Sequence, residues 1–283
     1  MTATITCDHV SMTIKGEEIL SSISCTFEEN KIYGLLGRNG AGKTTFMKLL
    51  TGQLLPTSGS IRLNGEDPFN NEKAQMHLCF IKESGNFLKG LTVNQLIKNI
   101  PSFFPNWDDQ LVDELLDRFE LPRHKRISTF SKGMESALGI TVGLGSRAPV
   151  TIFDEPYIGM DAANRQLFYD RLVEDYAEHP RTIIISTHLI DEIASVFERI
   201  TVIRKGKMIV DQEVDSLRNH AYKLTGKEND FDFLQGVQIL DEQRFMGKRT
   251  LTVLDEHGTL QSIPASIQKQ PLSLQDFMVQ VTK

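Results

Sequence analysis

The sequence contains few cysteines, and their number and spacing argue against a disulfide framework and against a metal site built from cysteines. Its 283 residues include 3 cysteines, at Cys7, Cys25 and Cys79, and no pair of them has the spacing of metal ligands. Their number is odd and their spacings are wide, which indicates a reducing compartment such as the cytosol and no disulfide framework. Small buried hydrophobic side chains are the simplest interpretation of all three.

A basic excess and a long apolar run are also absent. Asp and Glu number 37 against 31 Lys and Arg, a net charge of −6, whereas nucleic-acid binders usually carry a basic excess. We therefore expect no nucleic-acid partner. No stretch approaches the roughly 20 apolar residues of a membrane helix, and Met1–Val10 lacks the pattern of a signal peptide. The chain is expected not to cross a membrane, although it can dock onto a protein that does.

The periodicity of apolar residues predicts an α/β protein. Early strands are predicted at Thr4–Cys7, Ser11–Ile14, Ser24–Phe27, Lys31–Leu36 and Ile61–Leu63. Apolar residues at helical spacing follow in Thr92–Ile100 and Asp108–Glu120. Later strands are predicted at Val150–Phe153, Thr182–Ser186 and Ile200–Arg204, with helices between them at about Asn164–Tyr176 and Ile190–Phe197. This alternation predicts a parallel sheet with crossover helices.

The region after Leu217 has a weaker and more polar pattern. Its strand candidates are Val237–Leu240 and Thr250–Leu254. We expect residues 218–283 to form a small α+β unit, called the C-terminal extension below.

The strongest local motif is Gly37–Thr44, which reads GRNGAGKT and fits the phosphate-binding loop G-x-x-x-x-G-K-[ST]. A predicted strand precedes it and a predicted helix, Thr44–Leu50, follows. Glycines let backbone amides wrap a phosphate, Lys43 reaches the β- and γ-phosphates, and the Thr44 hydroxyl can hold Mg²⁺. The motif predicts phosphate binding with Mg²⁺, and the family resemblance described below implies that the phosphates are those of ATP. The expected phosphate contacts are Asn39, Gly40, Ala41, Gly42, Lys43, Thr44 and Thr45.

A second motif is the apolar strand that ends in Asp154 and Glu155, followed by Pro156. Alone, this pattern is also typical of an ordinary exit turn. Behind a phosphate-binding loop, Asp154 is expected to position Mg²⁺ through its outer shell. Glu155 is then expected to polarise the attacking water as a general base.

A third motif, Phe130–Met134, reads FSKGM and lies just upstream of that strand. With the other two motifs, it resembles the nucleotide-binding subunit of ABC (ATP-binding cassette) transporters, whose signature is usually Leu-Ser-Gly-Gly-Gln. The chain keeps Ser131 and Gly133 of that pattern. The resemblance implies a P-loop NTPase of ABC type over residues 1–217, with an antiparallel β subdomain and a helical subdomain at about 84–144.

The resemblance also implies roles for further residues. Asp161 matches the D-loop, and His188 matches the switch histidine that contacts the γ-phosphate, although a lone histidine is more often structural. In this family two cassettes pair head to tail, and the signature of each acts on the ATP of the other. The signature residues here are Ser131, Lys132, Gly133 and Met134.

Three residues depart from the family pattern. Glu83 lies at or near the place of a Gln, so it is either a ligand of Mg²⁺ or an exposed loop acid. Ile14 falls where an aromatic side chain normally stacks on adenine, and can offer only apolar contact. Tyr157 replaces the small residue usual after Asp-Glu-Pro.

The function implied is the ATPase subunit of a membrane exporter, with a second cassette of the same or a related chain. A separate integral membrane subunit would dock on the helical subdomain, and this chain would be cytoplasmic, peripheral on the inner face of the cell membrane. The Ser-Lys-Gly-Met signature resembles Gram-positive export cassettes for drugs or peptides. The alternatives are a soluble ABC-type ATPase acting on ribosomes or DNA, and a regulatory cassette with weak hydrolysis.

Overall fold

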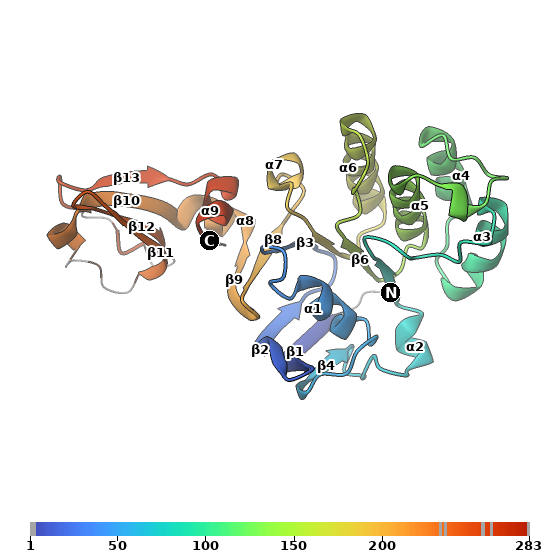
Figure 1. The fold of residues 1–283 in the computed structure, drawn as a ribbon, viewed down its shortest axis with the longest axis horizontal. Coiled ribbons are helices and arrows are strands. Elements are labelled where there is room, and N and C mark those ends of the chain that lie inside the picture. The colour runs from blue at the N-terminus through green and yellow to red at the C-terminus, as the bar shows by residue number, and fades with distance from the viewer. Residues whose placement is uncertain (1–3, 232–233, 235–236, 256–257, 261–262, 282–283) are drawn as a thin grey trace.

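The computed structural model describes residues 4–231, 234, 237–255, 258–260 and 263–281. These residues form one three-stranded, one six-stranded and one four-stranded sheet. The six-stranded sheet lies in the middle, helices cover it on one side, and the four-stranded sheet stands at the far end (Figure 1).

The central sheet has the strand order β5-β6-β7-β3-β8-β9. Its strands are β3 (Ile32–Leu36), β5 (Leu78–Ile81), β6 (Val150–Asp154), β7 (Thr182–Ser186), β8 (Arg199–Arg204) and β9 (Lys207–Glu213). All pairs are parallel except β8 with β9. Every residue of β3, β6 and β7 is buried, as a sheet covered on both faces requires. The predicted parallel sheet with crossover helices is confirmed.

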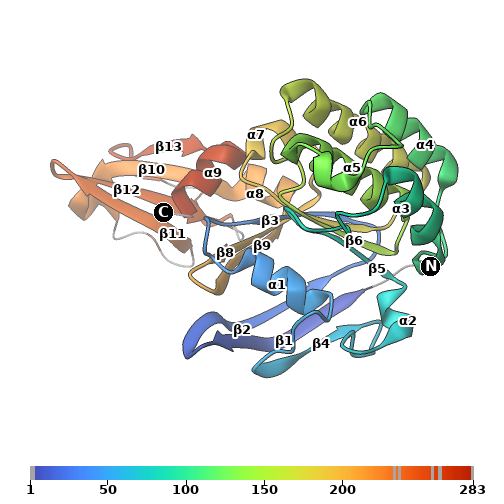
Figure 2. The same ribbon diagram turned by 45° about the vertical axis from the view of Figure 1, so that its right-hand side comes forward.

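An antiparallel sheet packs below the central one and encloses the first helix (Figure 2). It consists of β1 (Ile5–Ile14), β2 (Glu17–Phe27) and β4 (Ser58–Leu63), and α1 (Lys43–Leu50) lies between the two sheets. The two strands predicted at Thr4–Cys7 and Ser11–Ile14 are one continuous strand. Its pairing with β2 is irregular between Cys7 and Met12, and His9 there has a φ of 47°. This bulge interrupts the alternation that marks a strand.

The helical subdomain contains α3 (Val93–Asn99), α4 (Asp109–Arg118) and α5 (Lys132–Gly145), with short α2 (Glu72–Gln75) before it. Two 3₁₀ segments, η1 (Ile100–Phe103) and η2 (Ile127–Thr129), connect the helices. α4 packs closely on α5 because Gly145 has no side chain. A Cβ there would lie 2.1 Å from Cγ2 of Val112.

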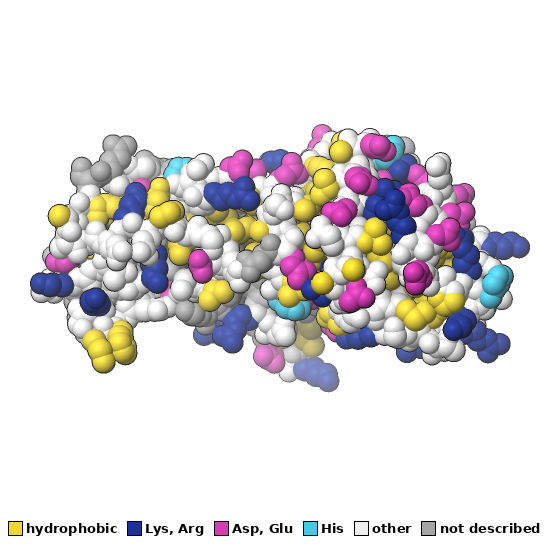
Figure 3. Space-filling model, turned by 90° about the horizontal axis from the view of Figure 1, so that it is seen from above, with side chains coloured by type: hydrophobic (Ala, Val, Ile, Leu, Met, Phe, Trp, Pro, Cys, Tyr) yellow, Lys and Arg dark blue, Asp and Glu magenta, His cyan; other side chains and the backbone are white. Residues whose placement is uncertain are grey.

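Two further helices follow β6 and β7. They are α6 (Ala162–Glu178) and α7 (Ile190–Ile193), so the helix predicted to reach Phe197 is shorter than expected. Arg171 of α6 lies 2.6 Å from Glu114 of α4 and links the two helices. Acidic side chains, interleaved with Lys and Arg, gather over the half of the molecule that carries these helices, on the right in Figure 3. Among the described helices, none has the length and apolar content needed to span a membrane.

The C-terminal extension is a four-stranded sheet of order β11-β12-β10-β13 with a helix at each end. α8 (Val214–His220) crosses the boundary at residue 218 and leads into the extension, and the other elements are β10 (Ala221–Lys227), η3 (Glu228–Phe231), β11 (Gln238–Phe245), β12 (Lys248–Leu254), β13 (Gln268–Pro271) and α9 (Leu274–Val281). Leu224, Leu251 and Val253 centre its own small core. Phe277 and Val281 of α9 belong instead to the main core, with Ile193 of α7.

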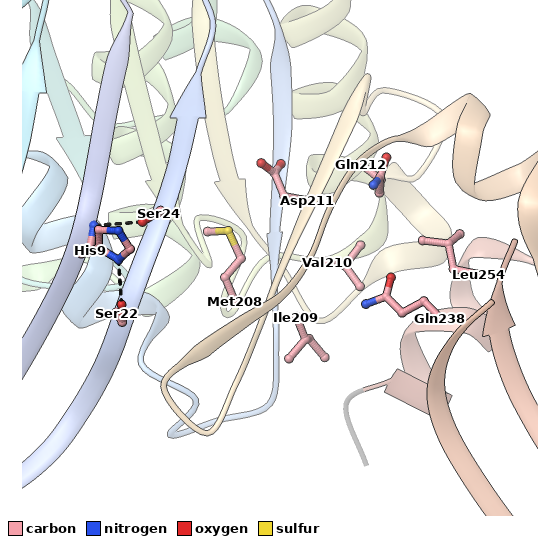
Figure 4. Close-up of a pocket in the computed structure, with 10 residues that line it drawn as sticks. All are labelled: His9, Ser22, Ser24, Met208, Ile209, Val210, Asp211, Gln212, Gln238 and Leu254. Carbon is pink, nitrogen blue, oxygen red and sulfur yellow. Dashed lines mark hydrogen bonds between the residues drawn. The ribbon is translucent and has the colours of Figure 1, made fainter. Parts of the chain in front are cut away.

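A cavity of about 480 Å³ lies between the extension and the rest of the chain. His9 and Ser22 line one side, Asp211 of β9 lies in the middle, and Gln238 and Leu254 line the extension side (Figure 4). The strand candidates of the extension fall in β11 and β12, whereas β10 and β13 had no matching prediction.

Candidate functional site

The three motif segments meet at one edge of the central sheet. β3, β7 and β6 are neighbours, and they run in parallel. The glycine-rich loop follows β3, Asp154 ends β6, and His188 follows β7. The carboxyl ends of neighbouring parallel strands form the usual ligand crevice of such sheets. The fold therefore brings together side chains that are more than a hundred residues apart in sequence.

The loop before α1 takes a conformation that needs glycine. Gly37, Gly40 and Gly42 have φ angles of 152°, 80° and 107°. A Cβ on Gly37 would lie 2.3 Å from the carbonyl oxygen of Ile203, and one on Gly42 would lie 2.6 Å from Leu20. A Cβ on Gly40 would meet nothing within 4 Å. The loop is thus tightly packed beneath and open at Gly40, as an anion cradle requires.

Lys43 is the buried cation of the site. It is 7% exposed, and its Nζ donates to the carbonyl oxygens of Gly37, at 2.8 Å, and Arg38, at 3.4 Å. Burial lowers the pKa of Lys43, and the charges of Glu155 and Asp154 oppose that shift. A buried ammonium held by carbonyl dipoles is stabilised by an added anion. The residues present therefore fit a phosphate.

Thr44 and Asp154 form the oxygen-rich part of the site. The Thr44 hydroxyl donates to Asp154 Oδ2 at 2.7 Å, and Ser186 Oγ donates to Oδ1 at 2.6 Å. These contacts fix the carboxylate with both oxygens engaged. In the described part of the chain, no group of three or more His, Cys, Asp or Glu side chains is placed to hold a metal. One hydroxyl beside one carboxylate fits Mg²⁺, which takes its other ligands from phosphates and water.

Glu155, Tyr157 and His188 form a hydrogen-bonded cluster beside Asp154. Oε2 of Glu155 accepts from the Tyr157 hydroxyl at 2.9 Å and lies 2.6 Å from His188 Nδ1. Glu155 is 8% exposed, and its Oε1 is buried without a hydrogen-bond partner among the described residues. Its backbone is also constrained, because φ is 49° and the amide donates to Ser186 Oγ. A buried carboxylate oxygen without a partner is suited to accept a proton.

The signature segment lies at the start of α5. Ser131 caps the helix by accepting from the amide of Met134 at 3.2 Å. Gly133 packs on the loop before α6, where a Cβ would lie 2.4 Å from the carbonyl oxygen of Gly159. Asp161 caps α6 by accepting from the amide of Asn164 at 2.8 Å. The roles of these residues toward a second cassette stay predictions.

Glu83 and Ile14 are the other two residues that depart from the family pattern. Glu83 Oε1 lies 2.9 Å from the Nζ of Lys132, and both side chains are half exposed. The loop acid thus pairs with the signature lysine, which the sequence pattern did not indicate. Ile14 ends β1 and is 38% exposed. A role of Glu83 toward Mg²⁺ and of Ile14 toward adenine stays a prediction.

Comparison with known proteins places the chain in a family. Residues 20–158 match the protein family described as ABC transporter. The chain is 32% identical over 213 residues to the bacitracin transport ATP-binding protein BcrA of Bacillus licheniformis, covering 73% of this chain and 69% of that protein. The chain belongs to the ABC transporter family of ATP-binding proteins. It is also 28% identical to YtrB, an ABC transporter ATP-binding protein of Bacillus subtilis (strain 168), over 76% of this chain and 74% of YtrB.

Solved structures agree with this assignment at the level of the fold. An ATP-binding subunit of an ABC transporter superposes with a TM-score of 0.68 at 22% identity, covering 76% of this chain and 92% of the other. A dimeric ATP-binding cassette in a post-hydrolysis state with ADP and Pi gives a TM-score of 0.66 at 18% identity, covering 74% and 98%. The resemblance to Gram-positive export cassettes is confirmed, and the chain is an ABC ATPase coupled to transport.

Proposed function

We propose that this ABC ATPase energises the export of peptides or drugs, and that Lys43, Thr44, Asp154, Glu155 and His188 carry the hydrolysis. The arrangement of these side chains at one sheet edge supports the proposal most. Lys43 binds the β- and γ-phosphates, and His188 binds the γ-phosphate. Mg²⁺, held by Thr44 and through water by Asp154, would neutralise charge on the transferred phosphoryl group. Glu155 accepts the proton of the attacking water.

Two cassettes are proposed to pair head to tail over two ATP molecules. α5 is a helix of 14 residues, and Ser131 and Lys132 at its start are exposed. A helix N-terminus favours an anion, so the signature residues of one cassette are suited to the γ-phosphate bound by the other. The cassette is proposed to span residues 1–217, with the extension from 218 to 283.

A membrane subunit is proposed to dock in an apolar groove of the helical subdomain, which would hold the chain on the inner face of the cell membrane. The groove has a volume of about 990 Å³ and is lined mainly by apolar side chains, among them Phe80, Leu88, Phe103 and Phe104. Leu88 is 75% exposed and Phe103 is 65% exposed. Exposed apolar side chains around one groove are typical of a protein–protein contact.

Substitutions in this groove are expected to weaken binding of the membrane subunit. Replacing both Leu88 and Phe103 with Glu would place charge in the apolar contact. We expect affinity for the membrane subunit to fall by about thirtyfold or more. The control is Phe245→Glu, which charges an aromatic side chain that is 72% exposed on the extension. Equal retention of the membrane subunit by both variants, measured after detergent extraction, would contradict the groove.

The class of partner decides between the proposed function and its alternatives. A tagged chain expressed in its own host is expected to co-purify with a multi-spanning membrane protein. The steady-state ATPase rate of that complex is expected to exceed the rate of the isolated chain. A regulatory cassette would hydrolyse ATP at the same negligible rate with and without that partner. A chain recovered with ribosomes or DNA instead would overturn the transport assignment.

A further inference from the structure

Tyr157 lies at the centre of the cluster around Glu155. Its side chain is 2% exposed, and the ring meets that of His188 edge-on at 5.9 Å between centroids. The hydroxyl contacts Glu155 Oε2, Thr187 Oγ1 and the backbone amide of His188. One buried oxygen therefore touches both the Asp-Glu segment after β6 and the histidine segment after β7.

The direction of each hydrogen bond to the Tyr157 hydroxyl follows from which neighbouring groups can only donate and which can only accept. The amide of His188 can only donate, at 3.2 Å, so it occupies one lone pair of the Tyr157 oxygen. The Glu155 carboxylate can only accept and so takes the Tyr157 proton, which leaves Thr187 Oγ1, itself an acceptor from the amide of Leu189 at 2.8 Å, to donate to the second lone pair of Tyr157. The single proton of Tyr157 is then directed at Glu155 Oε2, 2.9 Å away. Burial and the Glu155 charge raise the pKa of Tyr157, which keeps this proton in place at neutral pH.

The same contacts make the two oxygens of Glu155 different. Oε2 has the Tyr157 hydroxyl and His188 Nδ1 as partners, whereas the buried Oε1 has none in the described structure. A carboxylate held through one oxygen cannot rotate freely about its last bond. Such preorganisation keeps the reacting atom in one place before the reaction begins.

We propose that Tyr157 is a positioning residue that holds Oε2 of Glu155, so that Oε1 is the oxygen that takes the proton in hydrolysis. The inference rests on the proposed role of Glu155 as the base. In that step the oxygen of water forms a bond to the γ-phosphorus, and the bond from this phosphorus to the β–γ bridging oxygen breaks. ADP leaves with that electron pair, and the proton of water goes to Oε1.

The test is Tyr157→Phe, which removes the hydroxyl and keeps the ring. We expect kcat to fall by about tenfold or more, because a charge-assisted hydrogen bond is lost, while KM for ATP stays within about twofold. The control is Tyr176→Phe. The Tyr176 hydroxyl also meets a carboxylate, Glu198 Oε2 at 2.8 Å, and a carbonyl, Asn30 at 2.6 Å, at the opposite edge of the sheet. The Tyr176→Phe variant is expected to keep the wild-type kcat. A wild-type kcat in Tyr157→Phe would overturn the proposal.

A double-mutant cycle separates positioning from general stability. In a Glu155→Gln background the base is already absent, so Tyr157→Phe is expected to cause less than about a twofold further loss in single-turnover hydrolysis. An undiminished tenfold loss there would mean that Tyr157 acts without Glu155, and would overturn the inference. If Glu155→Gln itself kept full turnover, the base assignment of the proposed function would fail instead.

A second variant guards against a folding defect in Tyr157→Phe. Thr187→Val removes the donor that fixes the Tyr157 hydroxyl but keeps the size of the side chain. We expect kcat to fall by about threefold or more, with KM for ATP unchanged. Unchanged kcat in Thr187→Val would overturn the inference, because the hydroxyl would then need no fixed direction.

Discussion

Replacing Glu155 with Gln is expected to remove most ATP turnover and to leave ATP binding intact. Gln has the same shape and can still accept the Tyr157 hydrogen bond, but it cannot take a proton from water. Loss of a general base typically lowers the rate by about 10²–10⁴-fold. Phosphate release measures kcat, and titration with a fluorescent ATP analogue measures the dissociation constant.

A matched control for this prediction is Glu174→Gln. Glu174 lies on α6 with its side chain 61% exposed and pairs with Arg171 at the surface. Exposed pairs of this kind contribute little, so turnover is expected to stay at the wild-type level. Wild-type turnover in Glu155→Gln would show that another group takes the proton.

Replacing Lys43 with Ala is expected to weaken ATP binding by about a hundredfold or more. The change removes the charge-assisted hydrogen bonds of a buried ammonium to the phosphates, each worth about 1.5–3 kcal/mol. Isothermal titration with ATP measures the loss. Burial lowers the pKa of Lys43, so its charge already costs free energy in the free protein. The unfolding temperature without ATP is therefore expected to change by less than about 4 °C.

The control for Lys43 lies on the same helix. Lys48 is in the last turn of α1, at the end away from the loop, and is partly exposed. Lys48→Ala is expected to bind ATP as the wild type does. Equal ATP affinity in Lys43→Ala and the wild type would refute the assignment of the loop to phosphate binding.

Local sequence patterns predicted which segments of the chain form the candidate site. The loop at Gly37–Thr44, Asp154 and His188 each follow an apolar run, and such runs form the buried strands β3, β6 and β7. Parallel strands present their ends at one edge, so the meeting of these segments follows from the fold class alone.

Contacts between individual side chains were not predictable in this way. The Glu83–Lys132 pair and the bond from Tyr157 to Glu155 depend on how loops fold over the sheet edge. The sequence carried only one signal for the second, a large residue where a small one is usual. β13 (Gln268–Pro271) was missed because all its residues are exposed and it has no apolar alternation.

The position of α9 links the C-terminal extension to the segment that follows β7. Phe277 and Val281 share the main core with Ile193 of α7, and α9 contacts α7 directly. α7 begins at Ile190, two residues after His188. Close-packed contacts resist separation, so a force that moves the last helix also pulls on the segment that carries the histidine. α9 is thus coupled through α7 to the segment that carries His188, the residue proposed to bind the γ-phosphate.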